Sequence, residues 1–408
     1  MDILEAKQEV VKAGLQLVES GLIARTWGNV SCRVDDEYFV ITPSGRTYES
    51  LTPDDIVIVR IADCAYESDI KPSSEKGIHA QAYKLRPDCN FVIHTHQLNA
   101  SAVSFLGYDI PVEDEDAKAV IGSIVPIAKY GLSGTGKLKK NVAAAIARTD
   151  SKAVIMTHHG AVCLGKDYDE AFAVAGRLEQ VCADFLTDRL QAVSGTVTKQ
   201  VEAISSFLAD ANESRSQVEQ FAAYTSERDG STVIMRPRSG EEAVRIDIKT
   251  GDEMNGGTRE YPASAELHRA VYAAREDVNA IVHCDDPEVV DYSKFSGKVK
   301  PLIDDFAQIV GVTMKTAEYD PHNTMKTARK VVKKLKGRNA VMLRNNGALC
   351  AAANQYDAEA VEMVVKKEIR ANAAADIIGG AKYIGRISAC LERFVYTKKY
   401  SKQTKTNQ

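Results

Sequence analysis

The sequence has no paired cysteines, no long apolar run and no strong excess of charge of either sign. Its eight cysteines stand singly, without a Cys-x-x-Cys pair, which excludes a disulfide framework and a cysteine-rich zinc finger. We expect reduced, buried thiols in a cytoplasmic protein. No 18 consecutive residues are apolar, so a membrane-spanning helix and membrane insertion are excluded.

The charge balance also excludes a class of partner. The chain carries 52 Lys and Arg against 56 Asp and Glu, a net charge of −4, and has no surplus of cations to displace the counterions of nucleic acid. Residues 1–21 mix charged and apolar positions three and four apart, which predicts an amphipathic helix and not a signal peptide. With 408 residues and 44% hydrophobic residues, the chain is predicted to fold as two or three domains.

An internal repeat determines the predicted architecture. The stretch HAQAYKLRPDCNFVIHTH from His79 recurs 189 residues later as HRAVYAAREDVNAIVHCD from His268. The stretch KAVIMTHHGAVCLG from Lys152 recurs 187 residues later as NAVMLRNNGALCAA. Two copies of one domain therefore lie in tandem. We place them at residues 1–195 and 196–408, because turn-forming residues and a Ser-rich segment follow a long helical pattern near residue 195.

The first copy is predicted to be an α/β domain. Short β-branched and apolar runs bounded by Pro, Gly or Asp indicate strands; they span residues 38–42, 56–61, 91–94 and 152–156. Helical patterns cover residues 74–84, 99–105 and 170–193. The histidines of this copy follow two of the strands, where loops gather functional groups at a sheet edge.

Four histidines of the first copy form a candidate metal site. His94 and His96 are two residues apart, so in a strand their side chains point to the same face, and His158 and His159 follow another strand. Imidazoles suit zinc, which takes three or four protein ligands. Glu75, in Pro-Ser-Ser-Glu, is the candidate carboxylate ligand and general base. The alternatives are structural histidines and a carboxylate that only complements a helix dipole.

Three small polar clusters are candidates for holding a phosphate. Residues 28–31, 42–45 and 73–74 offer hydroxyls and exposed N–H groups, although each is also typical of a turn. Residues 131–137 match the first seven positions of a phosphate-binding P-loop, but Leu138 stands where that motif needs a hydroxyl for magnesium. For that segment we predict a turn and a helix cap and no nucleotide site.

These motifs together identify a family resemblance. They are Asn29 in WGNVS, Ser44 in ITPSG, Glu75 in PSSE, His94-Thr95-His96 and His158-His159-Gly160. In this order and at these separations, they resemble the class II aldolase/adducin family, especially its fuculose-phosphate aldolases, over most of residues 1–190. The resemblance implies a three-layer α/β/α domain with a mostly antiparallel central sheet, here present twice in tandem. It also implies a homo-oligomer, often a four-fold ring with its sites between neighbours.

The resemblance also implies a ligand set and a reaction. The metal, Zn²⁺ or another divalent ion, would be held by Glu75, His94, His96 and His159; His159 is chosen over His158 because the family's ligand directly precedes the Gly. The phosphate pocket would consist of Asn29, Ser44, Gly45, Ser73 and Ser74. The implied enzyme is a carbon–carbon lyase that cleaves a ketose phosphate into dihydroxyacetone phosphate and an aldehyde. Its partner is a small phosphorylated sugar.

One position of the first copy departs from the aldolase pattern. The family's aldolases carry a catalytic Tyr nineteen residues beyond the second His of His-x-His, and this chain has Glu115 there. We assign Glu115 as a catalytic candidate, with an exposed acidic turn as the alternative. A Glu at this place resembles the family's sugar-phosphate dehydratases, so dehydration stays open, as do decarboxylation and epimerisation on the same metal.

The second copy departs from the pattern more strongly. Ser264, Asp285 and Asn346 stand where the first copy has Glu75, His96 and His159, and only His283 is retained; these four cannot hold zinc. We therefore predict a silent second domain that resembles adducin in having the fold without the metal. The alternative for the whole chain is a non-catalytic interaction protein built from both copies.

Overall fold

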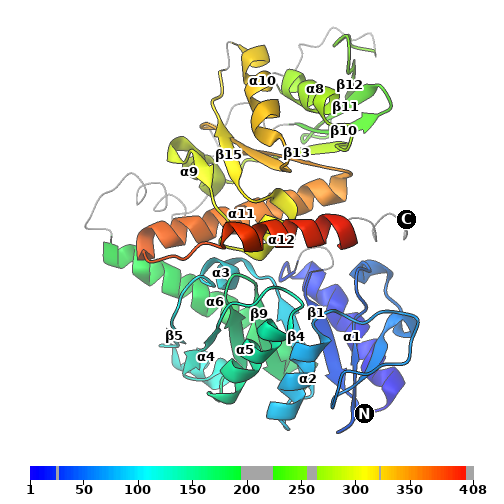
Figure 1. Ribbon diagram of the computed structural model, residues 1–408, viewed down its shortest axis with the longest axis vertical. Helices are drawn as coiled ribbons and strands as arrows, with labels where there is room; N and C mark the ends of the chain where they lie inside the picture. The colour runs from blue at the N-terminus through cyan, green and yellow to red at the C-terminus, as the bar shows by residue number, and fades with distance from the viewer. Residues whose placement is uncertain (24–26, 194–223, 255–263, 321–322, 401–408) are drawn as a thin grey trace. The chain divides into compact units, whose positions relative to one another are not determined.

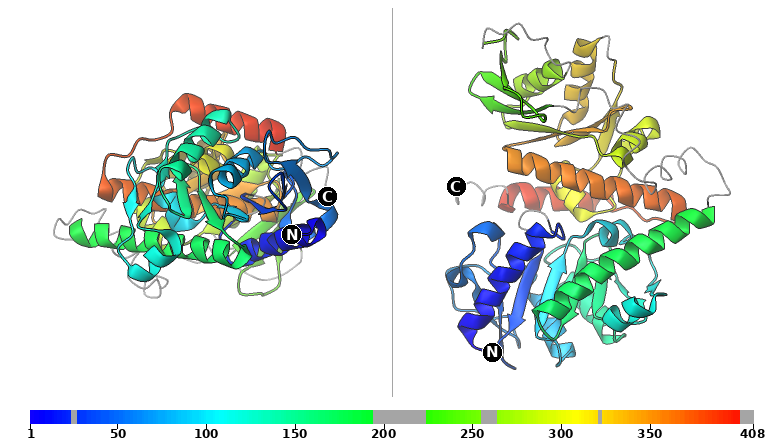
Figure 2. Two further views of the ribbon diagram at one scale, coloured as in Figure 1. Left: turned by 90° about the horizontal axis from the view of Figure 1, so that it is seen from below. Right: turned by 180° about the vertical axis from the view of Figure 1, so that it is seen from behind.

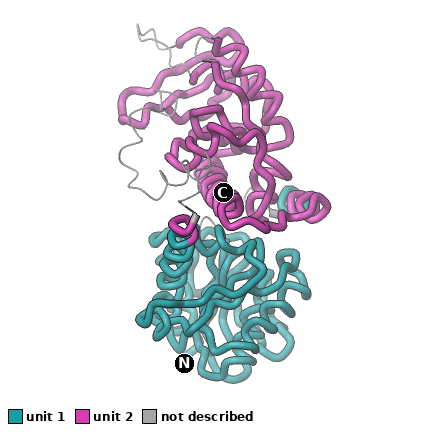
Figure 3. The backbone as a smooth tube through the Cα atoms, turned by 90° about the vertical axis from the view of Figure 1, so that its left-hand side faces the viewer, with its two compact units in different colours: residues 1–188, 394–408 teal, residues 189–393 magenta. Residues whose placement is uncertain are grey.

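The structure is a computed structural model, and it describes residues 1–23, 27–193, 224–254, 264–320 and 323–400. The chain divides into two compact units (Figure 3). Unit 1 is Met1–Asp188 with Phe394–Gln408, and unit 2 is Arg189–Arg393. The boundary proposed from the sequence, at residue 195, lies outside the described residues.

Unit 1 is built on a seven-stranded sheet with the order β3-β2-β1-β4-β9-β8-β7. The sheet is mixed, because β7 and β8 pair in parallel and the other neighbours pair antiparallel. The strands are β1 (Asn29–Arg33), β2 (Tyr38–Ile41), β3 (Val57–Arg60), β4 (Phe91–Thr95), β7 (Ile127–Ala128), β8 (Ala153–Met156) and β9 (Ala161–Gly165). A separate two-stranded sheet pairs β5 (Ile110–Pro111) with β6 (Ile124–Val125).

Helices cover both faces of this sheet, which confirms the predicted three-layer α/β/α architecture. Helices α2 (Lys76–Leu85) and α5 (Gly136–Ala147) lie on one face (Figure 1). The view from behind shows α1 (Ile3–Glu19) and α6 (Tyr168–Val193) on the other face (Figure 2). Helix α1 buries apolar residues three and four positions apart, as an amphipathic helix does. The remaining elements are α3 (Leu98–Ala102), α4 (Glu115–Ile121), η1 (Tyr48–Ser50) and η2 (Pro53–Asp55).

Unit 2 repeats this plan. Its sheet has the order β12-β11-β10-β13-β17-β16-β15-β14. The strands are β10 (Tyr224–Asp229), β11 (Thr232–Pro237), β12 (Val244–Asp247), β13 (Ala280–Cys284), β14 (Lys298–Val299), β15 (Met314–Ala317), β16 (Ala340–Leu343) and β17 (Ala348–Ala352). The helices are α8 (Ala265–Ala274), α9 (Pro287–Phe295), α10 (Thr324–Leu335), α11 (Gln355–Ile378), η5 (Phe306–Val310) and most of α12 (Arg386–Val395). The end of α12 and η6 (Tyr396–Tyr400) belong to unit 1.

Equivalent side chains make equivalent contacts in the two units. In unit 1, the Arg33 guanidinium donates to the main-chain carbonyls of Tyr83 and Arg86 at the end of α2. In unit 2, Arg228 makes the corresponding bonds at the end of α8. Both arginines tie the first strand of the sheet to the helix that precedes the central strand. The repeat seen in the sequence is therefore also a repeat of tertiary contacts.

The cysteines correct one expectation. All eight are free thiols, and six are buried as expected. Cys64 is only half-buried, because it lies in the turn after β3 with φ of 64°, and Cys390 is exposed on α12. In the parts of the chain that the structure describes, none of the helices has both the length and the apolar character needed to cross a membrane.

The glycines that precede β9 and β17 yield a stability prediction. A Cβ atom on Gly160 would lie 2.2 Å from the Thr95 carbonyl oxygen. A Cβ atom on Gly347 would lie 2.0 Å from the Cys284 carbonyl oxygen. Gly160→Ala should therefore force the paired strands apart and destabilise unit 1 by about 3 kcal/mol, which is measured as a fall in its thermal unfolding temperature. Gly176→Ala, in open space on α6, is the control and should cause no fall. Equal unfolding temperatures for both variants would contradict the prediction.

Candidate metal centre

Three histidines of unit 1 converge on one point. One ring nitrogen from each of His94, His96 and His159 lies within 4.8 Å of the others, and all three side chains are buried. His94 and His96 are carried by β4 and the residues that follow it. His159 joins them because β9 pairs antiparallel with β4, so that the turn before β9 lies beside the end of β4. The sheet thus brings together the three histidines expected to bind metal.

The backbone of the turn decides which of the two adjacent histidines enters the cluster. His158 has φ of 65°, in the left-handed region. Its ring lies 5.4 Å from the Tyr130 ring, whereas the His159 ring stacks on that of His94 at 5.0 Å. The structure therefore places His159 in the cluster and His158 outside it.

Glu75 supplies a carboxylate to the same cluster. Its Oε1 lies 3.0 Å from His159 Nε2, and its Oε2 lies 3.3 Å from His94 Nε2. Glu75 is the residue before α2 and is buried, but its side chain does not cap that helix. The expected alternative, a carboxylate serving only the helix terminus, does not describe this geometry.

The ionisation of the cluster follows from burial and from the neighbouring charges. Burial acts to raise the pKa of Glu75, but its interactions with His94 and His159, including a hydrogen bond with His159, outweigh burial and hold that pKa well below its usual range. Burial also lowers the pKa of His94 well below its usual value. An anionic carboxylate and neutral imidazoles are the protonation states in which these side chains bind a metal ion.

The donor set itself fits a cation. His94 Nδ1 lies 2.9 Å from the Ala161 carbonyl oxygen, which assigns the ring proton to Nδ1 and the lone pair to Nε2. That Nε2 lies 2.9 Å from His96 Nε2. Two nitrogens this close need a proton or a cation to offset their repulsion. Three imidazoles and one carboxylate are ligands that zinc accepts.

A series of buried hydrogen bonds links Glu75 to Asn29, His79 and Ser31. Asn29 Nδ2 donates to Glu75 Oε2 at 3.2 Å, and the His79 Nε2–H donates to Asn29 Oδ1. Ser31 Oγ donates to His79 Nδ1 at 2.6 Å. Burial lowers the pKa of His79 to about 4, so its ring is neutral at pH 7. Sequence reasoning misses His79 and includes Ser31 only in the segment expected to hold a phosphate. The signal in the sequence for His79 is its recurrence as His268.

The segments expected to bind phosphate meet beside Glu75. The Ser44 N–H donates to the Lys71 carbonyl at 2.8 Å, and the Ser73 N–H donates to the Thr42 carbonyl at 3.1 Å. Gly45 has φ of 76°, which glycine adopts without strain. Ser73 is buried and Ser74 is exposed. Asn29, expected in the same pocket, makes the contacts with Glu75 and His79 described above.

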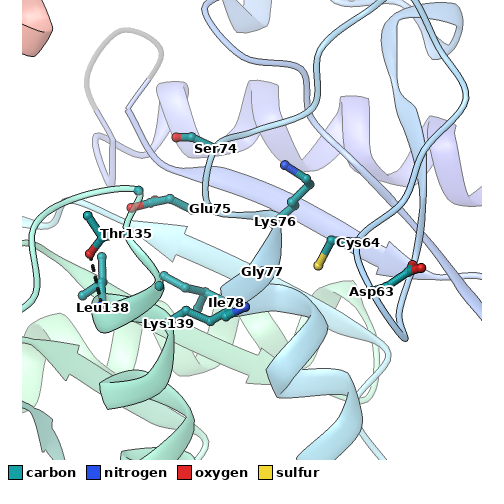
Figure 4. A pocket seen from close by; sticks show the side chains of 12 residues that line it. Asp63, Cys64, Ser74, Glu75, Lys76, Gly77, Ile78, Thr135, Leu138 and Lys139 are labelled. Carbon is teal, nitrogen blue, oxygen red and sulfur yellow. Dashed lines mark hydrogen bonds between the residues drawn. The ribbon is translucent and has the colours of Figure 1, made fainter.

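A cavity of about 200 Å³ opens next to Glu75 (Figure 4). Ser74, Glu75, Lys76 and Lys139 are among the residues that line it. It is therefore bounded by the start of α2 on one side and by α5 on the other. Its lining carries charges of both signs, Glu75 and Asp63 beside Lys76 and Lys139.

Glu115 is not part of the cluster. It begins α4, its side chain is 85% exposed, and it accepts a hydrogen bond from Lys118 Nζ at 2.7 Å. Within unit 1 the structure thus brings Glu75 and the three histidines together and leaves Glu115 at the surface.

The equivalent positions of unit 2 have a different chemistry. His283 Nε2 lies 2.7 Å from His268 Nε2, and both rings are buried. Asp285, at the position of His96, accepts from Arg238 at 2.9 Å. Asn346, at the position of His159, donates to the Arg344 carbonyl. Side chains that converge in unit 1 are thus bonded to other partners in unit 2.

Comparison with known proteins agrees with these observations. A sequence profile described as the Class II Aldolase and Adducin N-terminal domain matches residues 8–186 and 230–370, well over half of the chain. The chain belongs to the class II aldolase and adducin family. The two matched segments correspond to the two copies, so the predicted family is confirmed.

Individual relatives match the first copy in length. The L-fuculose phosphate aldolase of Escherichia coli (strain K12) is 34% identical over 180 residues, which cover 44% of this chain and 82% of that protein. The 5-deoxy-D-ribulose 1-phosphate aldolase of Bacillus thuringiensis serovar kurstaki is 33% identical over 180 residues, or 44% of this chain and 83% of that protein. A solved L-fuculose 1-phosphate aldolase is 28% identical with a TM-score of 0.43, covering 50% of this chain and 97% of that one. The two sequence relatives are named aldolases, so membership of the family supports aldolase activity.

The buried histidine pair of unit 2 predicts a pH dependence of stability. Burial lowers the pKa of His268 to about 3, below the value of about 6.5 in an unfolded chain. Above pH 6.5 the free energy of unfolding is therefore not reduced by His268. As the pH falls from 6.5 towards 3, His268 is protonated in the unfolded chain but not in the folded one, and the free energy of unfolding falls. Between pH 7 and 4.5 the loss should be about 3 kcal/mol, measured by urea unfolding. His268→Gln, which cannot titrate, should remove this part of the dependence. Identical pH profiles for the two proteins would contradict the prediction.

Proposed function

We propose that unit 1 is a zinc-dependent aldolase that cleaves a ketose phosphate into dihydroxyacetone phosphate and an aldehyde. The observation that carries this proposal is the convergence of three imidazole nitrogens within 4.8 Å, with the Glu75 carboxylate within 3.3 Å of two of them. In the proposal Glu75, His94, His96 and His159 hold Zn²⁺ or another divalent ion. When bound, such an ion supplies Lewis acidity to a carbonyl oxygen of the substrate.

The phosphate of the substrate binds where the Ser44–Gly45 and Ser73–Ser74 segments meet. Their serine hydroxyls are donors of the kind that phosphate oxygens accept. The two segments are joined by a β-bridge between Pro43 and Pro72, so the donors are positioned before the substrate arrives. This arrangement anchors the substrate next to Glu75.

Glu75 moves the proton on the nucleophilic carbon. The carboxylate is buried and held by Asn29. In cleavage its protonated form delivers the proton to the enediolate carbon, which gives dihydroxyacetone phosphate; in the reverse reaction the anion takes that proton back, in a site where few water molecules compete. In cleavage, the hydroxyl on the departing carbon loses its proton as it becomes the aldehyde carbonyl, so that oxygen needs a separate proton acceptor. We assign that role to Glu115, or to a group of a neighbouring domain; Glu115 lies at the surface of unit 1 and would act on the metal site of a neighbouring chain. This step therefore assumes a homo-oligomer.

Unit 2 is proposed to be a silent domain. It retains the fold but has Ser264, Asp285 and Asn346 at three of the four ligand positions. The eight free thiols are consistent with a protein of the cytoplasm, where thiols stay reduced. Aldol cleavage is distinguished from dehydration, decarboxylation or epimerisation by its products. The test is release of dihydroxyacetone phosphate from a panel of ketose 1-phosphates.

The ligand count predicts about one divalent ion per chain. Elemental analysis of the purified protein measures this ratio, and His94→Ala with His96→Ala should abolish binding because two of four ligands are lost. His283→Ala, the matched change in unit 2, should leave the ratio unchanged. Two ions per chain, or an ion retained by the double variant, would refute the assignment.

Glu75→Gln tests the general base. The amide keeps the shape of the side chain but cannot accept the proton, so turnover should fall by about 10²–10⁴-fold. The three histidines should keep much of the metal. Turnover is measured as dihydroxyacetone phosphate release at saturating metal. Nearly unchanged turnover would show that Glu75 is not the base.

A further inference from the structure

The Gly131–Lys137 segment forms a turn and a helix cap, as the sequence predicts. The Thr135 hydroxyl donates to the Leu132 carbonyl at 2.6 Å and accepts from the Leu138 N–H at the start of α5. A Cβ atom on Gly131 would lie 2.5 Å from the Leu138 nitrogen, so the loop folds tightly back on the helix. The loop is therefore held by the Thr135 hydrogen bonds and by close packing of Gly131 against the start of α5.

This loop lies directly against the candidate site. Gly134 has φ of 70°, and a Cβ atom built on it would lie 3.8 Å from the Ser74 hydroxyl. Gly134 and Thr135 also line the cavity beside Glu75. The loop thus forms a wall of the cavity on the side facing α5.

Ser133 is the residue of this loop that reaches the carboxylate. Its hydroxyl donates to Glu75 Oε1 at 3.5 Å, the same oxygen that lies 3.0 Å from His159 Nε2. Asn29 Nδ2 donates a hydrogen bond to the other oxygen, Oε2, at 3.2 Å. Each carboxylate oxygen therefore has one imidazole and one neutral hydrogen-bond donor.

We infer that Ser133 is a positioning residue for Glu75, an inference that rests on the proposed function. To accept a proton, the carboxylate has to loosen its contacts with the imidazole cluster while remaining ionised and buried. A buried carboxylate without partners is strongly unfavourable. Ser133 and Asn29 hold the carboxylate in place during that step, one on each oxygen, so that it faces the substrate carbon.

The remaining residues of the loop cannot fill this role. The Thr135 hydroxyl is engaged in capping α5, and Leu132 has no polar side-chain atom. Ser133 also differs from the metal ligands, because a hydroxyl is a hydrogen-bond donor here and contributes no imidazole or carboxylate to the cluster. Its loss should therefore slow proton transfer and leave metal binding intact.

The proton step can be observed separately from cleavage. With dihydroxyacetone phosphate in D₂O, the C–H bond of the nucleophilic carbon breaks, its proton passes to the Glu75 carboxylate, and a deuteron from solvent is returned to the carbon. No aldehyde is needed. The exchange rate is followed by NMR with the metal-loaded full-length chain.

Ser133→Ala should slow this exchange by about 10-fold, because the carboxylate loses one of two orienting donors. Ser133→Thr, which keeps the hydroxyl, should restore most of the rate. The KM for dihydroxyacetone phosphate should change by less than about two-fold, since the phosphate contacts are untouched. Ser50→Ala, an exposed serine on η1, is the matched control and should behave as wild type.

Metal affinity is the second readout and does not depend on activity. Trp27 is the only tryptophan, and its ring lies 6.4 Å from the His96 ring, so its fluorescence should report a titration of the metal-free chain with Zn²⁺. Because all four ligands are retained, Ser133→Ala should still bind Zn²⁺ at one ion per chain, with an unchanged thermal unfolding temperature.

The outcomes separate the two proposals. If wild type exchanges and Ser133→Ala exchanges equally fast, Ser133 does not position Glu75 and the inference is wrong. Loss of Zn²⁺ affinity or of folding in Ser133→Ala would also overturn it, because Ser133 would then support the metal site or the loop. If metal-loaded wild type shows no exchange, the proposed function fails, and the inference fails with it.

Discussion

The burial of one carboxylate, that of Glu75, is the constraint on which the candidate site depends. An ionised carboxylate taken out of water destabilises a protein unless opposite potential and hydrogen bonds compensate it. Here the contacts with His94 and His159 and a hydrogen bond from Asn29 provide that compensation. These groups come from β4, from the turn before β9 and from β1, so one buried charge ties together distant parts of the unit. The same groups provide the ligands that a divalent ion needs.

Unit 2 has no carboxylate at the position of Glu75, and its side chains at the ligand positions make other contacts. Ser264 takes the place of the carboxylate, and the remaining imidazole, His283, lies against His268 in a neutral buried pair. Asp285 is bonded to Arg238. The sheet and its apolar core persist, since their packing does not involve these side chains. The duplication therefore separates the fold from its chemistry: both units keep the architecture, and only unit 1 keeps the ligand set.

Neutral groups around Glu75 define its orientation as much as the imidazoles do. The chain from Ser31 through His79 to Asn29 is buried and leads to Oε2, and the loop before α5 brings Ser133 to Oε1. A carboxylate restrained on both oxygens keeps a defined orientation within the imidazole cluster. Such restraint of a reactive group by its neighbours is how a folded protein prepares a site before substrate binds.

The sequence by itself determined the tandem repeat, the α/β class and the residue types available for metal binding. These follow from local periodicity and from spacing. His94 and His96 share a face because strand side chains alternate. Apolar runs such as that of β8 predict a strand even before its partner strand is known. Tertiary structure alone decided which side chains meet. His159 enters the cluster because the left-handed φ of His158 turns the chain, and Glu75 turns away from its helix because imidazoles from other strands stabilise its charge. Asn29 contacts Glu75, and Glu115 stays at the surface. Both positions result from contacts between residues far apart in the chain, which a local sequence pattern does not encode.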